Sequence, residues 1–448
     1  MHIDFLNDVF RERADEEAFV WRDAPYSYSW LLERIGEARA TLDAANVDAH
    51  SVVMLHGEQS PHTIAALLAL IARSAIVVPV SSRSSKHAAQ FPEIARAAFS
   101  LEVSDAGEFT VSALAGDSDH ELYTTLKDRG APGLVLFSSG STGEPKGVVH
   151  DFDRLLTKYR TRRHCHRTLG FLLFDHIGGL DTTLYNLSNG SCLVLLDDRS
   201  PDGVCRAIAA HSVEVLPTAP SFLNLLAISG AAERHDLGSL RIVTYGAEMM
   251  PASTLEKCAA LFPNARMMQK YGTSEVGTLR SQSRSSDSLW VRVGGEGYET
   301  RVRDGQLQIR SESSMLGYLN AESPFTEDGW FKTGDAVEVD GEFIRFLGRK
   351  SDVINVGGQK VHPAEVENVI AGVENVAEVA VFGEENAMLG QIVCARVRPA
   401  RDEDVKELQR RIRAACRDAL DKYKIPSKFE FSDEALTDER FKVNRKTP

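Results

Sequence analysis

The chain has 448 residues, a length that fits either one large α/β body with a smaller second domain or about three domains of ordinary size. Hydrophobic residues make up 43% and charged residues 26%, which is typical of globular proteins and excludes a chain that is disordered throughout. The 51 Lys and Arg against 64 Asp and Glu give a net charge of −13, which argues against nucleic-acid binding by bulk charge. A site for an anionic ligand must therefore be locally basic or built from backbone N–H groups.

The six cysteines are scattered, and no two have the Cys-x-x-Cys spacing of a zinc site or a dithiol redox site. Single cysteines of this kind are typical of a reducing compartment. The N-terminal segment has no cationic region followed by an apolar run, and the longest apolar stretch, 63–80, is interrupted by Arg73 and Ser74. We therefore expect a cytoplasmic protein without a membrane span.

Helical spacing of apolar residues alternates with short β-branched runs over the first part of the chain. In chain order, the predicted elements are a helix over 30–45, a strand over 51–55, a helix over 65–72, strands over 76–80, 133–137 and 192–196, a helix over 221–228 and a strand over 242–245. This alternation predicts βαβ units and a mostly parallel sheet.

The pattern changes near residue 291 to short alternating segments with Asp-Gly turns at 304–305 and 340–341, which is typical of antiparallel hairpins. The segments concerned are 306–310, 336–339 and 343–346, and a compact α/β pattern resumes with a helix over 364–370, strands over 376–381 and 391–397, and an amphipathic helix over 405–420. We therefore predict an α/β fold. A large N-terminal body, 1–348, has mostly parallel sheets and a small β-barrel-like subdomain, and a small α+β domain occupies 349–448.

The strongest motif is the run SSGSTGEPKG over 138–147, directly after a predicted strand. Its first six residues are four hydroxyl residues and two glycines, Ser138, Ser139, Gly140, Ser141, Thr142 and Gly143, and a lysine, Lys146, follows at short reach. Backbone N–H groups, hydroxyls and one cation are what phosphate oxygens require, so the run predicts a phosphate-binding loop. It is not a Walker A loop, because Gly147 follows the lysine. The alternative is a surface linker, but the preceding strand and the closing Pro-Lys-Gly favour the loop.

This run resembles the phosphate-binding loop of the adenylate-forming superfamily, which comprises acyl- and aryl-CoA synthetases, adenylation domains of nonribosomal peptide synthetases and beetle luciferases. Five further segments resemble the superfamily's motifs in its own order. They are Gly246-Ala247-Glu248, Tyr271-Gly272-Thr273-Ser274-Glu275, a Thr-Gly-Asp motif ending at Asp335, a hinge and glycine loop over 348–361, and a terminal lysine motif over 441–445. Each is weak alone, but six in order over nearly the whole chain are specific.

The resemblance implies an enzyme that makes an acyl-adenylate from ATP and a small carboxylic acid, and then an acyl- or aryl-CoA thioester. The residues assigned to ATP are those of the phosphate-binding run together with Gly246, Ala247, Glu248, Tyr271, Gly272, Thr273, Ser274, Asp335 and Arg349. Glu275 would hold Mg²⁺, Tyr271 would stack near the adenine and Asp335 would bind the ribose hydroxyls. Lys442 would be the catalytic lysine at the α-phosphate and the acid.

The resemblance also implies that the C-terminal domain rotates about a hinge at Ser351 and presents Gly357 and Gly358 to the pantetheine arm of CoA. Ser351 stands where the superfamily usually has Asp or Lys, and a small polar residue can still absorb a backbone rotation. Phe441 replaces the glycine before the terminal lysine, which makes that loop stiffer and leaves Lys446 as a competitor for the catalytic role.

Three further features have both a functional and an ordinary structural interpretation. His176, which precedes Gly178 and Gly179 after an apolar run, could lie beside the reacting carboxylate or be a core histidine. Lys270 could face a polar substrate, although a solvent-facing lysine at a strand end is the favoured interpretation. A basic cluster over 162–167 could meet CoA phosphates, but a solvated helix face is preferred.

Several alternatives to the CoA ligase stay open. The main one is a stand-alone enzyme that loads the acid onto the phosphopantetheine of a carrier protein. An amino-acid-activating enzyme ranks third, because Asp175 does not align with the aspartate expected for the ammonium group. A nucleotide-binding module without turnover and a luciferase-like oxidase are disfavoured. Met249, Met250 and Phe222 suggest an apolar, medium-sized acid site, open to aromatic or aliphatic acids.

Overall fold

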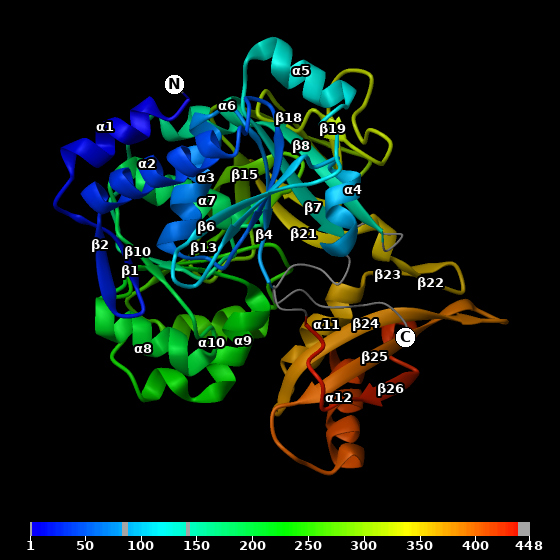
Figure 1. Ribbon diagram of the computed structural model, residues 1–448. Helices are drawn as coiled ribbons and strands as arrows, with labels where there is room; N and C mark the ends of the chain where they lie inside the picture. The colour runs from blue at the N-terminus through cyan, green and yellow to red at the C-terminus, as the bar shows by residue number, and fades with distance from the viewer. Residues whose placement is uncertain (1, 83–87, 140–143, 438–448) are drawn as a thin grey trace.

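A computed structural model describes residues 2–82, 88–139 and 144–437 of the chain. The predicted loop residues Gly140, Ser141, Thr142 and Gly143 and the catalytic candidate Lys442 lie outside the described residues, as does the side chain of Ser139. Within the described part, the chain forms three large sheets in the N-terminal body and a fourth sheet in a C-terminal domain (Figure 1).

The first sheet is parallel except at one edge, where β1 and β2 form an antiparallel pair. Its strands, in spatial order, are β13 (Arg266–Gln269), β12 (Ile242–Tyr245), β11 (Val215–Thr218), β9 (Thr168–Gly170), β10 (Leu193–Leu195), β1 (Glu17–Trp21) and β2 (Ala24–Ser27). The second sheet has the order β19 (Gly317–Tyr318), β8 (Pro145–Asp151), β7 (Gly133–Ser139), β4 (Ile76–Val80), β3 (Val52–His56), β5 (Phe99–Val103) and β6 (Phe109–Ala113). Its four central strands are parallel, which confirms the mostly parallel α/β prediction.

The third sheet is antiparallel throughout and confirms the subdomain expected from the Asp-Gly turns. Its order is β14 (Tyr271–Thr273), β15 (Gly277–Ser283), β16 (Val291–Gly294), β21 (Phe343–Arg349), β20 (Phe331–Asp340), β18 (Gln306–Ser311) and β17 (Tyr298–Arg303). Asp304 and Gly305 form the two-residue turn between β17 and β18, and both have positive φ, +51° and +70°. A primed turn needs this backbone conformation, which is why the dipeptide predicts the hairpin.

The helices of the body pack in layers around these sheets (Figure 1). They are α1 (Asp4–Glu12), α2 (Tyr28–Ala44), α3 (Pro61–Ala72), α4 (Phe91–Ile94), α5 (Glu121–Arg129), α6 (Phe152–Leu156), α7 (Ile177–Asn189), α8 (Pro201–His211), α9 (Pro220–Ser229) and α10 (Ala252–Leu261), with short 3₁₀ turns η1 (Ala88–Gln90), η2 (Thr157–Tyr159) and η3 (Ala231–Glu233). One core cluster joins α1, α2, α3 and α7 to strands of both parallel sheets, so these helices lie between the sheets. A second cluster joins α8, α9 and α10 to the other face of the first sheet.

The C-terminal domain follows η4 (Lys350–Asp352) and lies beside α9 and α10 (Figure 1). Its elements are β22 (Ile354–Val356), β23 (Gln359–Val361), α11 (Pro363–Ala371), β24 (Val376–Asn386), β25 (Gly390–Pro399), α12 (Val405–Ala419), η5 (Lys422–Lys424) and β26 (Lys428–Phe431). Hydrogen bonds join it to the body: among the described residues, Asn224 Nδ2 donates to the Ala377 carbonyl oxygen at 2.8 Å, and the Ala252 N–H donates to Asn368 Oδ1 at 2.7 Å. Among the described residues, no helix is long and apolar enough to cross a membrane.

Helix α7 begins at a place where only glycine fits, and this fixes the position of His176 before it. A Cβ atom on Gly179 would lie 1.9 Å from the Leu173 carbonyl oxygen, whereas Gly178 has more room. His176 is the N-cap of α7, because its Nδ1 accepts a hydrogen bond from the Gly178 N–H at 3.2 Å. The Gly-Gly pair therefore allows the chain before α7 to pack tightly on the first turn of the helix.

We expect Gly179→Ala to lower the free energy of unfolding by about 2–3 kcal/mol, because the added methyl meets a backbone carbonyl that cannot move aside. Urea denaturation measures the change. The matched control is Gly36→Ala in α2, where nothing lies within 4 Å of the added atom. That control should gain roughly 0.5–1 kcal/mol from helix propensity, and equal effects at the two glycines would contradict the packing argument.

Candidate active site

Tyr271 and Asp335 are 64 residues apart in the chain and meet in one partly buried hydrogen bond. The Tyr271 hydroxyl donates to Asp335 Oδ2 at 2.6 Å, and the Tyr271 ring stacks on Phe346 with centroids 4.8 Å apart. Asp335 lies in β20 after Gly334, which has φ +77°, and its own N–H donates to Thr333 Oγ1 at 3.0 Å. The Thr-Gly-Asp segment is therefore a fixed bend that aims the carboxylate at the start of β14.

Burial dominates the electrostatics of this pair. It raises the pKa of Asp335 above the ordinary aspartate value, although the Tyr271 hydrogen bond and the nearby Arg349 act in the opposite direction. Burial and the Asp335 charge also raise the pKa of Tyr271, so its hydroxyl stays protonated and remains a donor. Arg349 Nε lies 3.6 Å from Asp335 Oδ1, the second oxygen of the carboxylate. The carboxylate thus has one oxygen occupied by tyrosine and one directed toward the arginine.

Glu275 and Lys146 meet at Tyr318, in the short strand β19. The Tyr318 hydroxyl donates to Glu275 Oε1 at 2.8 Å, and Lys146 Nζ lies 5.2 Å from the centre of the Tyr318 ring. Glu275 also carries backbone contacts, because its carbonyl oxygen accepts from the Met315 N–H at 2.7 Å. The charge of Glu275 raises the pKa of Asp335, after the larger effect of burial, so the two carboxylates belong to one electrostatic group.

We call this group the nucleotide site. Its members come from β8, β14 and the turn after it, β19, β20 and β21: Lys146, Tyr271, Glu275, Tyr318, Asp335 and Arg349. The structure therefore brings together five of the residues that the sequence assigns to the nucleotide and its metal: Lys146, Tyr271, Glu275, Asp335 and Arg349. Gly272, Thr273 and Ser274 connect Tyr271 to Glu275 in the same segment, and the Ser274 carbonyl oxygen accepts from His150 Nε2 at 2.6 Å.

Sequence reasoning missed Tyr318, His150 and Asn320. Asn320 holds the start of β8 by donating from Nδ2 to the Pro145 carbonyl oxygen at 2.8 Å and accepting from the Gly147 N–H at 3.1 Å. His150 is fully buried, and burial lowers the pKa of its imidazole. No local pattern identifies these residues, because β19 has two residues and gains its position only by pairing with β8. Ser138, at the end of β7, is only partly buried and pairs in register with Lys146.

The segment Gly246-Ala247-Glu248 follows β12 in a strained turn. Ala247 has φ +68°, a left-handed conformation that costs a non-glycine residue roughly 1–2 kcal/mol. Ser221 at the start of α9 holds the turn, because its N–H and its hydroxyl both donate to Glu248 Oε2, at 3.1 and 2.6 Å. A Cβ atom on Gly246 would lie 2.7 Å from the Lys270 carbonyl oxygen, so this glycine lets the turn approach the residue before Tyr271.

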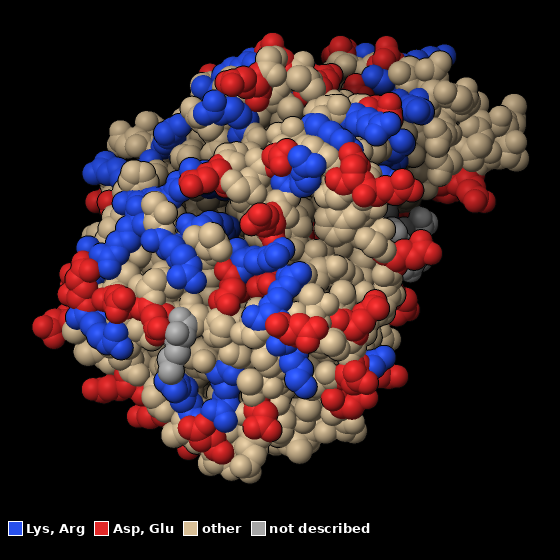
Figure 2. Space-filling model, turned by 90° about the horizontal axis from the view of Figure 1, so that it is seen from above, with Lys and Arg blue, Asp and Glu red and all other residues tan. Residues whose placement is uncertain are grey.

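Two expectations about neighbouring residues need correction. Lys270 is half-buried rather than solvent-facing, because it packs on the side of the first sheet that faces α7, and burial lowers the pKa of its ammonium group. The basic segment 162–167 is not a helix face. Its Arg162 pairs with Glu12 at 2.7 Å and its Arg167 with Glu17 at 2.7 Å. Lys and Arg are likewise intermixed with Asp and Glu over the face in Figure 2.

Phe222 and Met250, two of the residues expected to line the acid site, are core residues instead. They are 0% and 4% exposed and belong to the cluster with α8, α9 and α10, where the Phe222 ring lies 4.4 Å from that of Phe171. They therefore give no information on the size of the acid. Asp175 is also buried, and its Oδ2 accepts from the Ser81 hydroxyl at 2.8 Å.

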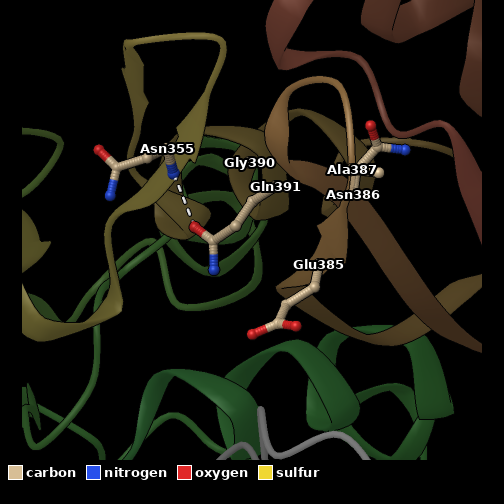
Figure 3. Close-up of a pocket in the computed structure, with 6 residues that line it drawn as sticks. All are labelled: Asn355, Glu385, Asn386, Ala387, Gly390 and Gln391. Atoms are coloured by element: carbon tan, nitrogen blue, oxygen red, sulfur yellow. Dashed lines mark hydrogen bonds between the residues drawn. The ribbon is translucent and has the colours of Figure 1, made fainter.

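In the C-terminal domain, Gly357 and Gly358 form the two-residue turn between β22 and β23, with φ +56° and +86°. The Gly357 N–H donates to the Leu389 carbonyl oxygen at 2.8 Å, which ties the turn to the tip of the β24–β25 hairpin. An open hollow lies beside this turn. Figure 3 shows Gln391 reaching from β25 to the backbone N–H of Asn355, with an N to Oε1 distance of 2.8 Å. Ser351 is exposed in η4, where its hydroxyl donates to Asp352 Oδ1 at 2.8 Å.

The residues of the nucleotide site fit a divalent cation held through Glu275 together with ligands from outside the protein chain. No group of three or more His, Cys, Asp or Glu side chains in the described ranges could hold a metal ion. Glu275 Oε1 accepts from Tyr318, and the carboxylate offers oxygen ligands of the kind that Mg²⁺ prefers. Mg²⁺ bound with ATP usually takes one or two carboxylates, several waters and phosphate oxygens, and the residues present match that pattern.

The fold and the clustered residues define an adenylate-forming enzyme. A model of the AMP-binding enzyme family matches residues 6–319, and a model of the AMP-binding enzyme C-terminal domain matches residues 365–440. The chain therefore belongs to the AMP-binding enzyme family. It is an AMP-forming acid–thiol ligase, the class that uses ATP, Mg²⁺ and CoA to make an acyl-adenylate and then a thioester.

Two relatives illustrate the similarity. Indoleacetate–CoA ligase of Aromatoleum aromaticum is 26% identical over 93% of this chain and 91% of its own. A 2-succinylbenzoate–CoA ligase of Bacillus velezensis is 31% identical over 70% of this chain and 67% of its own. A solved anthranilate CoA ligase in complex with anthranoyl-AMP has a TM-score of 0.84 at 21% identity, covering 99% of this chain and 95% of that one, and supports the fold alone.

We expect Asp335→Asn to raise the KM for ATP by roughly 10- to 100-fold, because the amide cannot make charge-assisted hydrogen bonds to hydroxyl groups. Its effect on stability should have the opposite sign. The pKa of Asp335 is higher in the folded state than in the unfolded state. As the pH rises through the interval between these two pKa values, the carboxylate ionises and the protein loses stability, whereas the neutral amide avoids this loss. The free energy of unfolding at pH 7 should therefore stay level or rise.

ATP-dependent kinetics and urea denaturation at pH 7 test both expectations for this variant. Asp48→Asn, an exposed aspartate in the turn before β3, is the matched control and should change neither quantity. A variant with unchanged KM for ATP would contradict the role of Asp335 at the nucleotide.

We expect Ala247→Gly to raise the free energy of unfolding by about 0.5–1 kcal/mol. Relief of the left-handed strain exceeds the extra backbone entropy that glycine gives the unfolded chain. Thermal or urea unfolding measures it. Ala40→Gly on the exposed face of α2, where the backbone is helical, should instead lose about 1 kcal/mol. A loss at both alanines would show that the turn is not strained.

Proposed function

We propose that this enzyme activates a small carboxylic acid, aromatic or short-to-medium aliphatic, as its adenylate and transfers the acyl group to CoA. One observation carries the proposal: Lys146, Glu275, Asp335 and Arg349 come from separate elements and meet around Tyr271 and Tyr318. Two cations and two carboxylates at one place match a bound nucleotide, whose phosphates need cations and whose ribose offers two hydroxyls to a carboxylate.

The proposed roles follow from this charge arrangement. Asp335 accepts the ribose hydroxyls, and Arg349 beside it contacts the ribose or a phosphate. Lys146, together with the run that begins at Ser138, holds the β- and γ-phosphates. Glu275 holds Mg²⁺, which when bound neutralises phosphate charge during the transfer. Lys442 approaches the α-phosphate and the acid.

In the first half-reaction, a carboxylate oxygen of the acid attacks the α-phosphorus of ATP, and the bond from that phosphorus to the bridging oxygen breaks. Pyrophosphate leaves, and the acid becomes a mixed anhydride with AMP. Negative charge develops on the phosphoryl and leaving oxygens, so catalysis consists of positioning and electrostatic stabilisation. Lys442 and Lys146 supply the positive charge, and no residue of the enzyme forms a covalent bond.

His176 is proposed to lie beside the reacting carboxylate. Its Nδ1 accepts from the Gly178 N–H, so the neutral ring carries its proton on Nε2 and can donate from there. The N-cap bond fixes the ring at the start of α7, which makes a positioning role for the acid compatible with its structural role. Names of relatives, such as indoleacetate–CoA ligase and 2-succinylbenzoate–CoA ligase, support an aromatic acid.

For the second half-reaction, we propose that the body, 1–348, and the C-terminal domain, 349–448, rotate about Ser351 and bring the glycine turn to the adenylate. The Gly357-Gly358 turn has no side chains that would block a thin pantetheine arm, and the exposed position of Ser351 supports a hinge there. A carrier protein could offer the same arm. Thioester formation that saturates with free CoA and releases AMP would favour CoA as the acceptor, and its absence would favour a carrier protein.

We also place the enzyme in the cytoplasm. All six cysteines are free thiols, and Cys205, Cys258, Cys394 and Cys416 are buried. Burial raises the pKa of Cys258 to about 12, so this thiol is inert. Unpaired cysteines are typical of a reducing compartment.

ATP–pyrophosphate exchange over a panel of carboxylic acids tests the proposed function. We expect exchange with at least one small acid, and we expect Lys442→Ala to lower the rate at least about 100-fold, because charge stabilisation in the transition state is lost. Lys446→Ala is the matched control and should keep the exchange rate. If Lys446→Ala lost the exchange activity while Lys442→Ala kept a normal rate, the catalytic role would belong to Lys446. If the wild type showed no exchange with any acid, the proposal would be overturned.

A further inference from the structure

Lys270 lies between β13 and β14, on the side of the first sheet that faces α7. Side chains alternate between the two faces of a strand. Val243 and Met267 belong to the cluster with α8, α9 and α10, so Thr244, Met268 and Lys270, each an odd number of positions from one of these two residues, point to the opposite face. That face is the one that packs against the helices between the sheets.

The acidic residue that acts on Lys270 from that side, Asp181 of α7, already has other partners. Its Oδ1 accepts from the Tyr159 hydroxyl at 2.7 Å and from Lys158 Nζ. Lys158 Nζ donates in addition to the Thr278 carbonyl oxygen at 3.0 Å, which fixes this lysine on β15. Asp181 and Lys158 thus form a closed ion pair, anchored at both ends.

Lys270 does not take part in this ion pair. In residues 2–82, 88–139 and 144–437 its ammonium group makes no hydrogen bond and no ion pair, although Asp181 is near enough to act on its charge. Lys158, Asp181 and Lys270 together contribute two ammonium groups and one carboxylate, an excess of positive charge in a half-buried region. Such an excess is unfavourable unless an anion completes it.

The position of Lys270 connects this region to the proposed reaction. It directly precedes Tyr271 of the nucleotide site, and its carbonyl oxygen would lie 2.7 Å from a Cβ atom on Gly246. The Lys270 N–H donates to the Tyr245 carbonyl oxygen at 2.7 Å, which fixes the backbone at the carboxyl end of β12. In parallel α/β sheets, ligands bind beyond the carboxyl ends of the strands. Lys270 therefore links the nucleotide site to the side of the first sheet that faces α7, and we expect the acid to extend from the nucleotide toward that side.

We infer that Lys270 is a specificity-determining residue, and that the acid carries a second anionic group, a carboxylate, which pairs with Lys270 while the first carboxylate attacks ATP. This inference rests on the proposed function and narrows the acid from any small carboxylic acid to a dicarboxylic acid. An acid with an apolar end would leave the Lys270 charge desolvated and unpaired, which disfavours its binding.

Adenylation kinetics with matched acids test the inference. The pairs are isophthalate against benzoate, 2-succinylbenzoate against benzoylpropionate, and glutarate against butanoate, so that each pair differs in one carboxylate. The wild type should prefer the dicarboxylic acid in at least one pair. Lys270→Met should lower kcat/KM for that acid by roughly 10- to 100-fold, the loss of one charged hydrogen bond, and should leave or improve kcat/KM for its monocarboxylic partner.

A conservative variant and a remote one separate recognition from folding. Lys270→Arg keeps the charge and should retain part of the preference for the dicarboxylic acid. Lys406→Met, an exposed lysine at the start of α12, is the matched control and should keep the wild-type preference. Because Lys270→Met removes an excess charge, the melting temperature of this variant should not fall. The preference of the wild type for one member of each pair is measured on the unmodified enzyme, so it does not depend on the folding of any variant.

Three results would overturn the inference. The wild type could adenylate the two members of every pair equally, or prefer the monocarboxylic ones. Alternatively, Lys270→Met could keep the preference for the dicarboxylic acid. Lys270 would then interact electrostatically with Asp181 and would not bind the acid. In these cases adenylation itself persists and the proposed function stands. If the wild type adenylates no acid of any kind, the proposed function fails and the inference fails with it.

Discussion

The hydrogen bond between the Tyr271 hydroxyl and the Asp335 carboxylate is the contact on which the site depends. It joins β14, the edge strand that follows β13 of the first sheet directly, to β20, which is not its neighbour in the same antiparallel sheet. The Phe346 ring packs on Tyr271 from β21, so the bond is shielded from water, which strengthens it. Glu275 and Arg349 take their positions from the same two segments. Loss of this contact would therefore separate Asp335 from Glu275, the two carboxylates of the nucleotide site.

The sequence predicts much of this arrangement because the signals are local. A buried β-branched run indicates β4 with the bounds observed, Ile76–Val80, and the Asp-Gly turns indicate the hairpins of the third sheet. Motif order along the chain predicts which segments share a ligand. How distant segments meet at one site depends on tertiary packing, which no local pattern encodes. The residues that the sequence analysis missed or misjudged show this. Tyr318 is placed by a two-residue strand that has no pattern of its own, and Lys270 is half-buried on the side of the first sheet that faces α7.

Function places several unfavourable features within this small region. Ala247 is held in a left-handed conformation, Asp335 carries a charge that burial disfavours, and Lys270 carries one without a partner in the described chain. Selection for stability alone would favour glycine at position 247, asparagine at position 335 and methionine at position 270. Strain and desolvated charge of this kind persist where the surrounding structure over-determines them, and they cluster at binding and catalytic sites. Their proximity supports one site rather than three unrelated defects.

The overall charge of the chain makes the few cations of this region decisive. A protein with net charge −13 repels both ATP and a carboxylic acid at long range, so binding must come from short-range contacts. The structure keeps those cations from being neutralised by the many surface acids. Lys146 lies against the Tyr318 ring rather than a carboxylate, and Arg349 shares Asp335 at 3.6 Å without a close bond. Lys270 makes no hydrogen bond to Asp181, whose Oδ1 accepts instead from Lys158. Each cation thus remains available to an anionic ligand, which explains how an acidic protein can gather two anions at one place.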